Sequence, residues 1–276
     1  MSFFNSIFYG FISGITEILP VSSQAHQALM RYLFGVDTRI PLQEFLVHIG
    51  VLLSLFVGAS EMLKRLMRER KSLIGRHHRR IRNTDSKGYF ELRLLKSASV
   101  LLFVGLFFYF STKKYETGLL PIMTFWVINA VFLLVADHMP RGNRDARTMS
   151  ALDGLVMGIV GALSVFPGIS RTGMISSYAI ARGVDCDTSI NWSVLLSIPA
   201  LLFYLLFDVI NLITVGMGAL TTGAIAYCAL SGLSAFLGGY LGVSLLRLVL
   251  NQTGLAKFAY YCIGTAMFTF AIFLIT

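Results

Sequence analysis

The chain has 276 residues, of which 55% are hydrophobic and only 13% charged, and its mean hydropathy is +0.72. A soluble domain carries roughly a quarter charged residues, and several apolar runs here reach the length of about 18 residues that crosses a bilayer. This composition excludes a soluble globular protein and predicts an all-α integral membrane protein, with residues 1–276 forming a single domain.

Apolar segments alternate with short polar ones along the whole chain. Two of the apolar segments, residues 3–30 and 154–181, are interrupted by a proline, Pro20 or Pro167, and by the polar side chains that follow it. We expect each of these two segments to form a re-entrant pair of helices. The alternative for each is an ordinary kinked membrane helix. The six uninterrupted segments, which predict transmembrane helices, are residues 45–62, 94–112, 119–136, 189–211, 222–246 and 256–276.

The net charge of +9 is concentrated in one block, because 12 of the 23 Lys and Arg residues lie between Lys64 and Lys96. Basic residues beside a membrane span mark a cytoplasmic loop, here residues 64–93. Aromatic residues that would stack on bases are sparse in this block, which argues against a nucleic-acid partner. With six crossings, both termini face outside, and the two interrupted segments enter from opposite faces.

The two interrupted segments also resemble each other. A shift of 147 positions places Pro20 on Pro167 and Ser23 on Ser170. Inverted-topology repeats place a binding site near the midplane, where interrupted helices from the two halves meet. We therefore predict an inverted repeat with halves of approximately residues 1–136 and 154–276, and a site between the two interruptions.

The second interruption carries Arg171. An arginine at the bilayer centre costs at least about 2.5–3.5 kcal/mol and needs an anion or a wet cavity. If a helix begins near this residue, its N-terminal N–H groups, the guanidinium and nearby hydroxyls together form a phosphate site. The alternative is that Arg171 only neutralises Glu17. The neighbours that offer hydroxyls or close backbone approach are Gly168, Ser170, Thr172 and Gly173.

The first interruption carries Glu17, Ser22, Ser23 and His26. Ser23 and His26 are three residues apart and share a face if a helix restarts after Pro20. The histidine could activate a hydroxyl, attack phosphorus itself or protonate a leaving group. Glu17 could orient the histidine, act as a base or hold a divalent cation that bridges phosphates.

A second acidic and basic pair opens the segment at residues 45–62. Glu44 and His48 are four residues apart and share a helix face. Two interpretations stay open, namely a pair at the membrane surface and a supporting role behind the site.

The motifs Glu17-x-x-Pro20-Val21-Ser22-Ser23-x-x-His26 and Pro167-Gly168-Ile169-Ser170-Arg171-Thr172-Gly173 resemble those of the BacA-type undecaprenyl-diphosphate phosphatases. The resemblance implies six spans with two re-entrant loops, a homodimer, and a bacterial inner-membrane location with the site open to the outer face. It also implies hydrolysis of undecaprenyl diphosphate to the monophosphate and phosphate, aided by Mg²⁺ or Ca²⁺.

Carried over by position, Glu17 is an acidic metal ligand or base, and Ser23 and His26 are the candidate nucleophile and acid or base. Ser22, Ser170, Arg171, Thr172 and the two glycines of the second motif would bind the diphosphate, with Arg171 also counted as catalytic.

The sequence departs from the family pattern at three positions. The first motif usually has two carboxylates four residues apart, and Ser13 stands at the first of them. The second motif usually has Gln at the position of Gly161 and Thr at that of Ile175, next to Ser176. Fewer carboxylates weaken metal binding, so a transporter, flippase or binder of a polyprenyl phosphate without hydrolysis is the alternative function.

Overall fold

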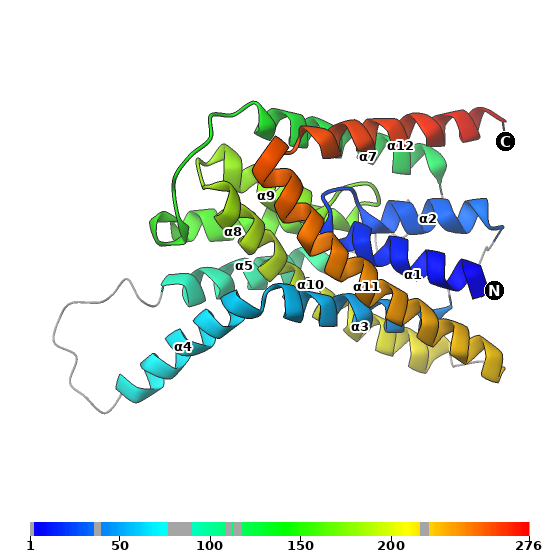
Figure 1. Cartoon of the computed structure of the whole chain (residues 1–276), viewed down its shortest axis with the longest axis horizontal. Coiled ribbons are helices and arrows are strands. Elements are labelled where there is room, and N and C mark those ends of the chain that lie inside the picture. The colour runs from blue at the N-terminus through cyan, green and yellow to red at the C-terminus, as the bar shows by residue number, and fades with distance from the viewer. Residues whose placement is uncertain are drawn as a thin grey trace.

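The computed structural model describes residues 3–35, 40–76, 90–108, 112, 118–215 and 221–275, and these residues are almost entirely helical (Figure 1). Five of the described helices are long and apolar enough to cross a membrane. They are α3 (Pro41–Gly58), α7 (Leu119–Asp137), α10 (Cys186–Val215), α11 (Thr222–Thr253) and α12 (Ala256–Ile275). The predicted all-α membrane fold is confirmed.

The remaining predicted span corresponds to α5 (Phe90–Leu106), whose apolar part covers Leu94–Leu106. The basic segment was predicted to be a loop over residues 64–93, but its first part is helical. Helix α3 ends at Gly58, and a further helix, α4 (Ser60–Arg76), follows it. Lysine and arginine are good helix formers, so a basic segment leaving the membrane readily stays helical. Residues 77–89 of the predicted loop lie outside the described part of the chain.

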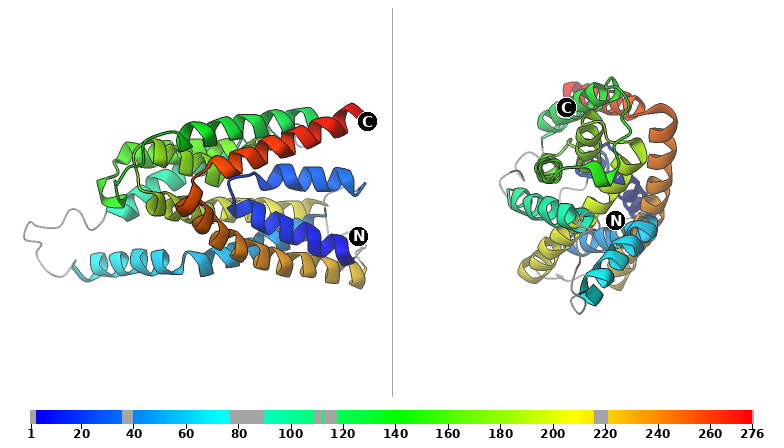
Figure 2. Two further views of the ribbon diagram at one scale, coloured as in Figure 1. Left: turned by 45° about the horizontal axis from the view of Figure 1, so that its top comes forward. Right: turned by 90° about the vertical axis from the view of Figure 1, so that its left-hand side faces the viewer.

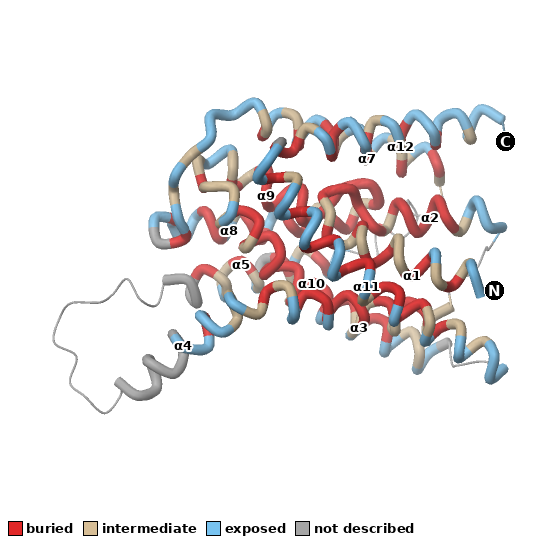
Figure 3. Tube along the Cα trace, in the orientation of Figure 1, coloured by how far each residue is buried: buried red, intermediate tan, exposed pale blue. Residues whose placement is uncertain are grey.

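Each proline-interrupted segment forms two helices and not one kinked helix. The first pair is α1 (Phe3–Ile18) and α2 (Ser23–Leu33), and the second is α8 (Ala151–Ala162) and α9 (Arg171–Ala181). Figures 1 and 2 show the two pairs at opposite ends of the molecule, each with its turn directed towards the middle. The residues between the paired helices therefore meet deep inside the protein, where the tube in Figure 3 is buried.

Close packing against α11 fixes α1, the helix that carries Glu17. A Cβ atom at Gly14 would lie 2.2 Å from the carbonyl oxygen of Ala235 on α11, so only glycine permits this approach. Small residues allow membrane helices to pack backbone against backbone. This packing fixes the position of α1, and so of Glu17 near its C-terminal end, relative to α11.

Helix α7 holds the two turns together. Asn129 donates from Nδ2 to the Pro20 carbonyl at 3.0 Å, and its Oδ1 accepts from the Ser170 backbone N–H at 3.0 Å. One turn away on α7, Trp126 donates from Nε1 to the Val21 carbonyl at 2.8 Å. Proline and the broken helices leave backbone groups without helical partners, and these side chains satisfy them.

Replacing Asn129 should therefore destabilise the protein. Asn129→Ala leaves the Pro20 carbonyl and the Ser170 N–H without this partner, at roughly 1–3 kcal/mol for each buried group. We expect a lower thermal unfolding temperature in detergent than for Asn251→Ala, the matched change at an exposed asparagine. Equal unfolding temperatures for the two variants would show that Asn129 does not support the turns.

Candidate active site

The first turn places Ser22 in an unusual backbone conformation. Its φ of 68° lies in the left-handed region, which a residue with a Cβ adopts at a cost of about 1–3 kcal/mol. The Ser22 Oγ accepts a hydrogen bond from the Gly168 N–H at 3.0 Å, which joins the first turn to the second. Gly168 has a φ of 121°, and a Cβ there would lie 2.6 Å from the Cβ of Phe125. The second turn thus needs glycine for its contact with α7.

The second turn ends at a capped helix N-terminus. The α9 helix begins at Arg171 with Ser170 as its N-cap, and Ser170 Oγ accepts from the Gly173 N–H at 3.2 Å. Thr172 Oγ1 lies 3.1 Å from the same Ser170 oxygen. The predicted helix start at Arg171 is confirmed, and its positive dipole end lies beside the guanidinium.

A buried ion pair connects the two turns. Arg171 Nη2 lies 2.8 Å from Glu17 Oε1, with the arginine side chain 3% exposed and the carboxylate side chain 9%. Arg171 Nε donates to Ser197 Oγ on α10 at 3.1 Å, which fixes the plane of the guanidinium. The other Glu17 oxygen, Oε2, accepts a hydrogen bond from Ser23 Oγ at the start of α2. One carboxylate therefore holds both the cation and the hydroxyl.

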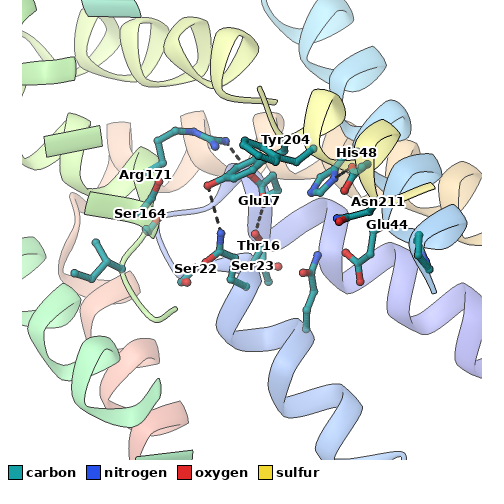
Figure 4. Close-up of a pocket in the computed structure, with 17 residues that line it drawn as sticks. Thr16, Glu17, Ser22, Ser23, Glu44, His48, Ser164, Arg171, Tyr204 and Asn211 are labelled. Atoms are coloured by element: carbon teal, nitrogen blue, oxygen red, sulfur yellow. Dashed lines mark hydrogen bonds and ion pairs between the residues drawn. The ribbon is translucent and has the colours of Figure 1, made fainter. Parts of the chain in front are cut away.

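Glu17, Ser23 and Arg171 line a pocket between the two turns, α3 and α10 (Figure 4). The pocket brings together seven of the residues predicted from the sequence, and four of its other lining residues come from α10. The predicted residues that line it are Glu17, Ser22, Ser23, Glu44, His48, Ser170 and Arg171. The residues of α10 that line it are Tyr204, Phe207, Asp208 and Asn211.

Glu44 and His48 both line this pocket. Each pairs with a different helix and not with the other. Glu44 Oε1 accepts from Tyr9 OH at 2.5 Å and lies 3.7 Å from Arg31 Nη1. His48 Nδ1 lies 2.6 Å from Asp208 Oδ2.

The structure places His26 outside the pocket, contrary to the expectation that it faces Arg171 across a shared cavity. Both ring nitrogens are occupied: Nδ1 lies 2.6 Å from the Ser22 carbonyl and Nε2 lies 2.8 Å from Tyr261 OH on α12. The ring also packs edge-on against Trp126, with centroids 5.1 Å apart. His26 therefore points towards α7 and α12, whereas Ser23 on the same helix faces the pocket, so the two do not share a face as expected.

Five further predicted residues do not line the pocket. Thr172, Gly168 and Gly173 act in the turn and the helix cap described above. Ser13 and Ser176 are buried, and their hydroxyl oxygens have no partner among the described residues. Ser13 precedes Glu17 by one helical turn on α1, where the family pattern has its other carboxylate.

The contributions of α10 and of Ser164 to the pocket were not predicted from the sequence. Asp208 lies in an otherwise apolar span, and an ionisable residue in such a span is a default candidate for function. Ser197 and Tyr204 were not singled out, because a serine in a helix can satisfy its hydroxyl on its own backbone, as Ser197 does at Ser193, and a lone tyrosine in an apolar span indicates packing. Ser164 lines the pocket, is 6% exposed, and its Oγ has no hydrogen-bond partner in the described structure.

Comparison with known proteins shows the family of this chain. The family model described as "Bacitracin resistance protein BacA" matches residues 6–268. The chain belongs to the BacA family. Proteins named undecaprenyl-diphosphatase from Thermosipho africanus and Alkaliphilus metalliredigens are 30% and 28% identical to it. The alignments cover 96% and 99% of this chain, and 98% and 100% of those proteins. The protein named "Undecaprenyl-diphosphatase 3" from Bacillus cereus is 29% identical over 96% of the chain and 95% of its own length.

The two occupied nitrogens of His26 predict a structural role that a substitution can test. His26→Gln removes partners from the Ser22 carbonyl and Tyr261 OH and should lower the thermal unfolding temperature in detergent. Because the side chain does not line the pocket, we expect phosphate release per folded molecule to fall less than tenfold. A loss of turnover at unchanged stability would instead support the catalytic role that the motif predicted for His26.

Proposed function

We propose that this member of the BacA family is a multi-pass membrane phosphatase that hydrolyses undecaprenyl diphosphate to the monophosphate and phosphate. The observation that carries the proposal is the continuous contact from Arg171 through Glu17 to Ser23 on the wall of one buried pocket. The names of the relatives indicate the same reaction for those proteins.

The second turn supplies the groups that bind the diphosphate. Arginine presents donors that suit phosphate oxygens, and the adjacent start of α9 adds the positive end of a helix dipole. Arg171 uses Nη2 for Glu17 and Nε for Ser197, which leaves its other terminal nitrogen for a ligand. The Ser164 hydroxyl lines the pocket and has no partner in the described structure, so it adds a neutral donor, whereas the Ser170 hydroxyl already donates to the Leu19 carbonyl.

The first turn supplies the nucleophile. Ser23 Oγ attacks the terminal phosphorus of the lipid diphosphate, and its proton passes to Glu17, with which it is already hydrogen-bonded. The bond between that phosphorus and the bridging oxygen breaks, and the lipid monophosphate leaves with the electron pair. Arg171 stabilises the charge that develops on the phosphoryl oxygens. Water then hydrolyses the phosphoserine and releases phosphate.

In this proposal, the diphosphate binds inside the membrane domain while the lipid tail stays in an apolar environment. Pro41 at the start of α3 and Asn211 near the end of α10 both line the pocket. By the positive-inside rule, the opposite ends of these helices, beside the basic α4, face the cytoplasm. The proposal therefore includes a bacterial inner-membrane location and a pocket open to the outer face.

A divalent cation would have few protein ligands at this site. No group of three or more His, Cys, Asp or Glu side chains suited to a metal occurs among the described residues. Mg²⁺ commonly takes one or two carboxylates and completes its shell with waters and substrate phosphates. We propose that Glu17 would hold Mg²⁺ or Ca²⁺ together with the substrate, and that the cation neutralises phosphate charge.

A transporter or binder without hydrolysis is the less favoured function. Such a protein needs the cation of Arg171 but has no use for a hydroxyl held on a carboxylate. The contact between Ser23 and Glu17 therefore favours the enzyme. Assembly as a homodimer stays a prediction, which light scattering of the purified protein would test.

The phosphatase proposal is tested by phosphate release from undecaprenyl or farnesyl diphosphate by the purified protein in detergent, with Mg²⁺ or Ca²⁺. We expect turnover by the wild type and a loss of at least about 10³-fold in Ser23→Ala, because the nucleophile is absent. Ser244→Ala, on the exposed side of α11, is the matched control and should match the wild type. The absence of wild-type turnover with either ion, or full turnover by Ser23→Ala, would contradict the proposal.

The missing carboxylate at position 13 predicts a gain of function. Ser13→Glu, one helical turn before Glu17, would restore the carboxylate pair of the family pattern. We expect half-maximal activity at a lower Mg²⁺ or Ca²⁺ concentration, measured by titrating the ion in the phosphate-release assay. An unchanged midpoint, with the variant still folded, would show that this position does not limit cation binding.

A further inference from the structure

A histidine and an aspartate from two different helices form a contact on the pocket wall. His48 lies on α3 and Asp208 on α10, and His48 Nδ1 lies 2.6 Å from Asp208 Oδ2. The side chains are 14% and 11% exposed. Ionisable residues are costly inside a membrane domain, and those that occur there are usually paired and functional. This pair lines the same pocket as Ser23 and Glu17 (Figure 4).

The hydrogen bond with Asp208 occupies one ring nitrogen of His48 and leaves the other available to a ligand in the pocket. An ionised carboxylate only accepts hydrogen bonds, so Nδ1 carries the proton in the contact with Asp208. The other nitrogen, Nε2, has no hydrogen-bond partner among the described residues, although the residue lines a polar pocket. Tyr204 stacks on the ring with centroids 5.6 Å apart, and its OH accepts from Gln24 Nε2 at 3.3 Å. The ring is thus held from two sides, and one nitrogen is left for a ligand.

The hydrogen bonding of His48 differs from that of the other two histidines that the structure describes, His26 and His138. His26 has both nitrogens occupied outside the pocket. His138 is exposed at the end of α7, and its Nδ1 contacts the carbonyl of Leu134 in its own helix. A carboxylate that orients one ring nitrogen while the other faces the reacting groups is the arrangement that makes histidine an effective proton carrier.

We propose that His48, oriented by Asp208, carries the proton in the phosphatase reaction. The inference rests on the proposed function, since it assigns a role within that reaction. In the first step, Nε2–H of His48 donates its proton to the bridging oxygen as the bond from phosphorus to that oxygen breaks and Ser23 Oγ bonds to phosphorus. The lipid monophosphate leaves, and neutral His48 remains beside the phosphoserine.

The second step returns the proton. Neutral His48 Nε2 accepts a proton from water as the water oxygen attacks the phosphoserine phosphorus. The bond between phosphorus and Ser23 Oγ breaks, Oγ recovers its proton from Glu17, and phosphate leaves. One water is consumed, and His48, Glu17 and Ser23 return to their starting protonation states. Asp208 stays ionised throughout and acts as the positioning residue.

The pocket contains other groups that influence the charge of His48. Asp208 and Tyr204 face it from α10, and Glu44 lies one turn before it on α3. Glu17 from α1 and Arg171 from α9 complete the titratable and charged groups that line the pocket. The last two neutralise each other through their ion pair, so Asp208 is the charge in direct contact with the ring.

The test compares His48→Gln with His138→Gln, the same change at the exposed histidine. Both are purified in detergent with folding checked by thermal unfolding, and both are given farnesyl diphosphate labelled with ³²P in its terminal phosphate. We expect kcat of His48→Gln to fall about 10²–10³-fold while KM changes less than threefold. Because a phosphate monoester leaves more readily than a serine alkoxide, the second step should suffer more, and label should accumulate on Ser23. The double variant with Ser23→Ala should carry no label.

Asp208→Asn is a second variant, which tests the same inference if His48→Gln does not fold. An amide at this position donates to Nδ1 and moves the ring proton to Nε2, which blocks the second step and should also trap the label. Turnover by either folded variant within threefold of His138→Gln would overturn the inference, and so would a loss of turnover without trapped label. The proposed function fails separately, if the wild type itself releases no phosphate.

Discussion

The pairing of Glu17 with Arg171 is the interaction on which the site depends. The two residues lie 2.8 Å apart and come from the two helix pairs that enter the molecule from opposite ends. Removing one member of a buried pair typically costs about 3–5 kcal/mol, because the other charge stays buried and uncompensated. Neither helix pair can therefore withdraw from the centre without exposing a charge to an apolar interior, and the pocket between the turns is kept open and polar.

The same pair explains how one carboxylate serves several tasks. Glu17 orients the guanidinium that is to bind phosphate and accepts the hydrogen bond of the Ser23 hydroxyl. Ser197 on α10 holds the guanidinium and Asn129 on α7 holds the backbone of the two turns, so the site is supported by helices. Rigid support of this kind keeps catalytic groups near their productive geometry. The unpartnered Ser13 hydroxyl lies at the position for which the resemblance implied a further carboxylate.

Much of the fold could be predicted from the sequence, because apolar length and interrupting prolines report directly on how a chain crosses a bilayer. Glu17, Ser23 and Arg171 could also be predicted, since each is polar and lies within four residues of a proline that interrupts an apolar segment. The direction of His26 could not, because the face that α2 presents to the pocket is set by contacts with α7 and α12. The partner of His48 could not either, since Asp208 lies on a helix that is distant in sequence.

An experimental structure with a non-hydrolysable lipid diphosphonate, such as a farnesyl methylenediphosphonate, tests the central claim most directly. We expect both phosphonate groups in the pocket between the turns, with one in contact with Arg171 and the terminal phosphorus within reach of Ser23 Oγ. We also expect Arg171 to remain paired with Glu17 in the complex. A ligand bound elsewhere on the protein, or a terminal phosphorus shielded from Ser23, would contradict it.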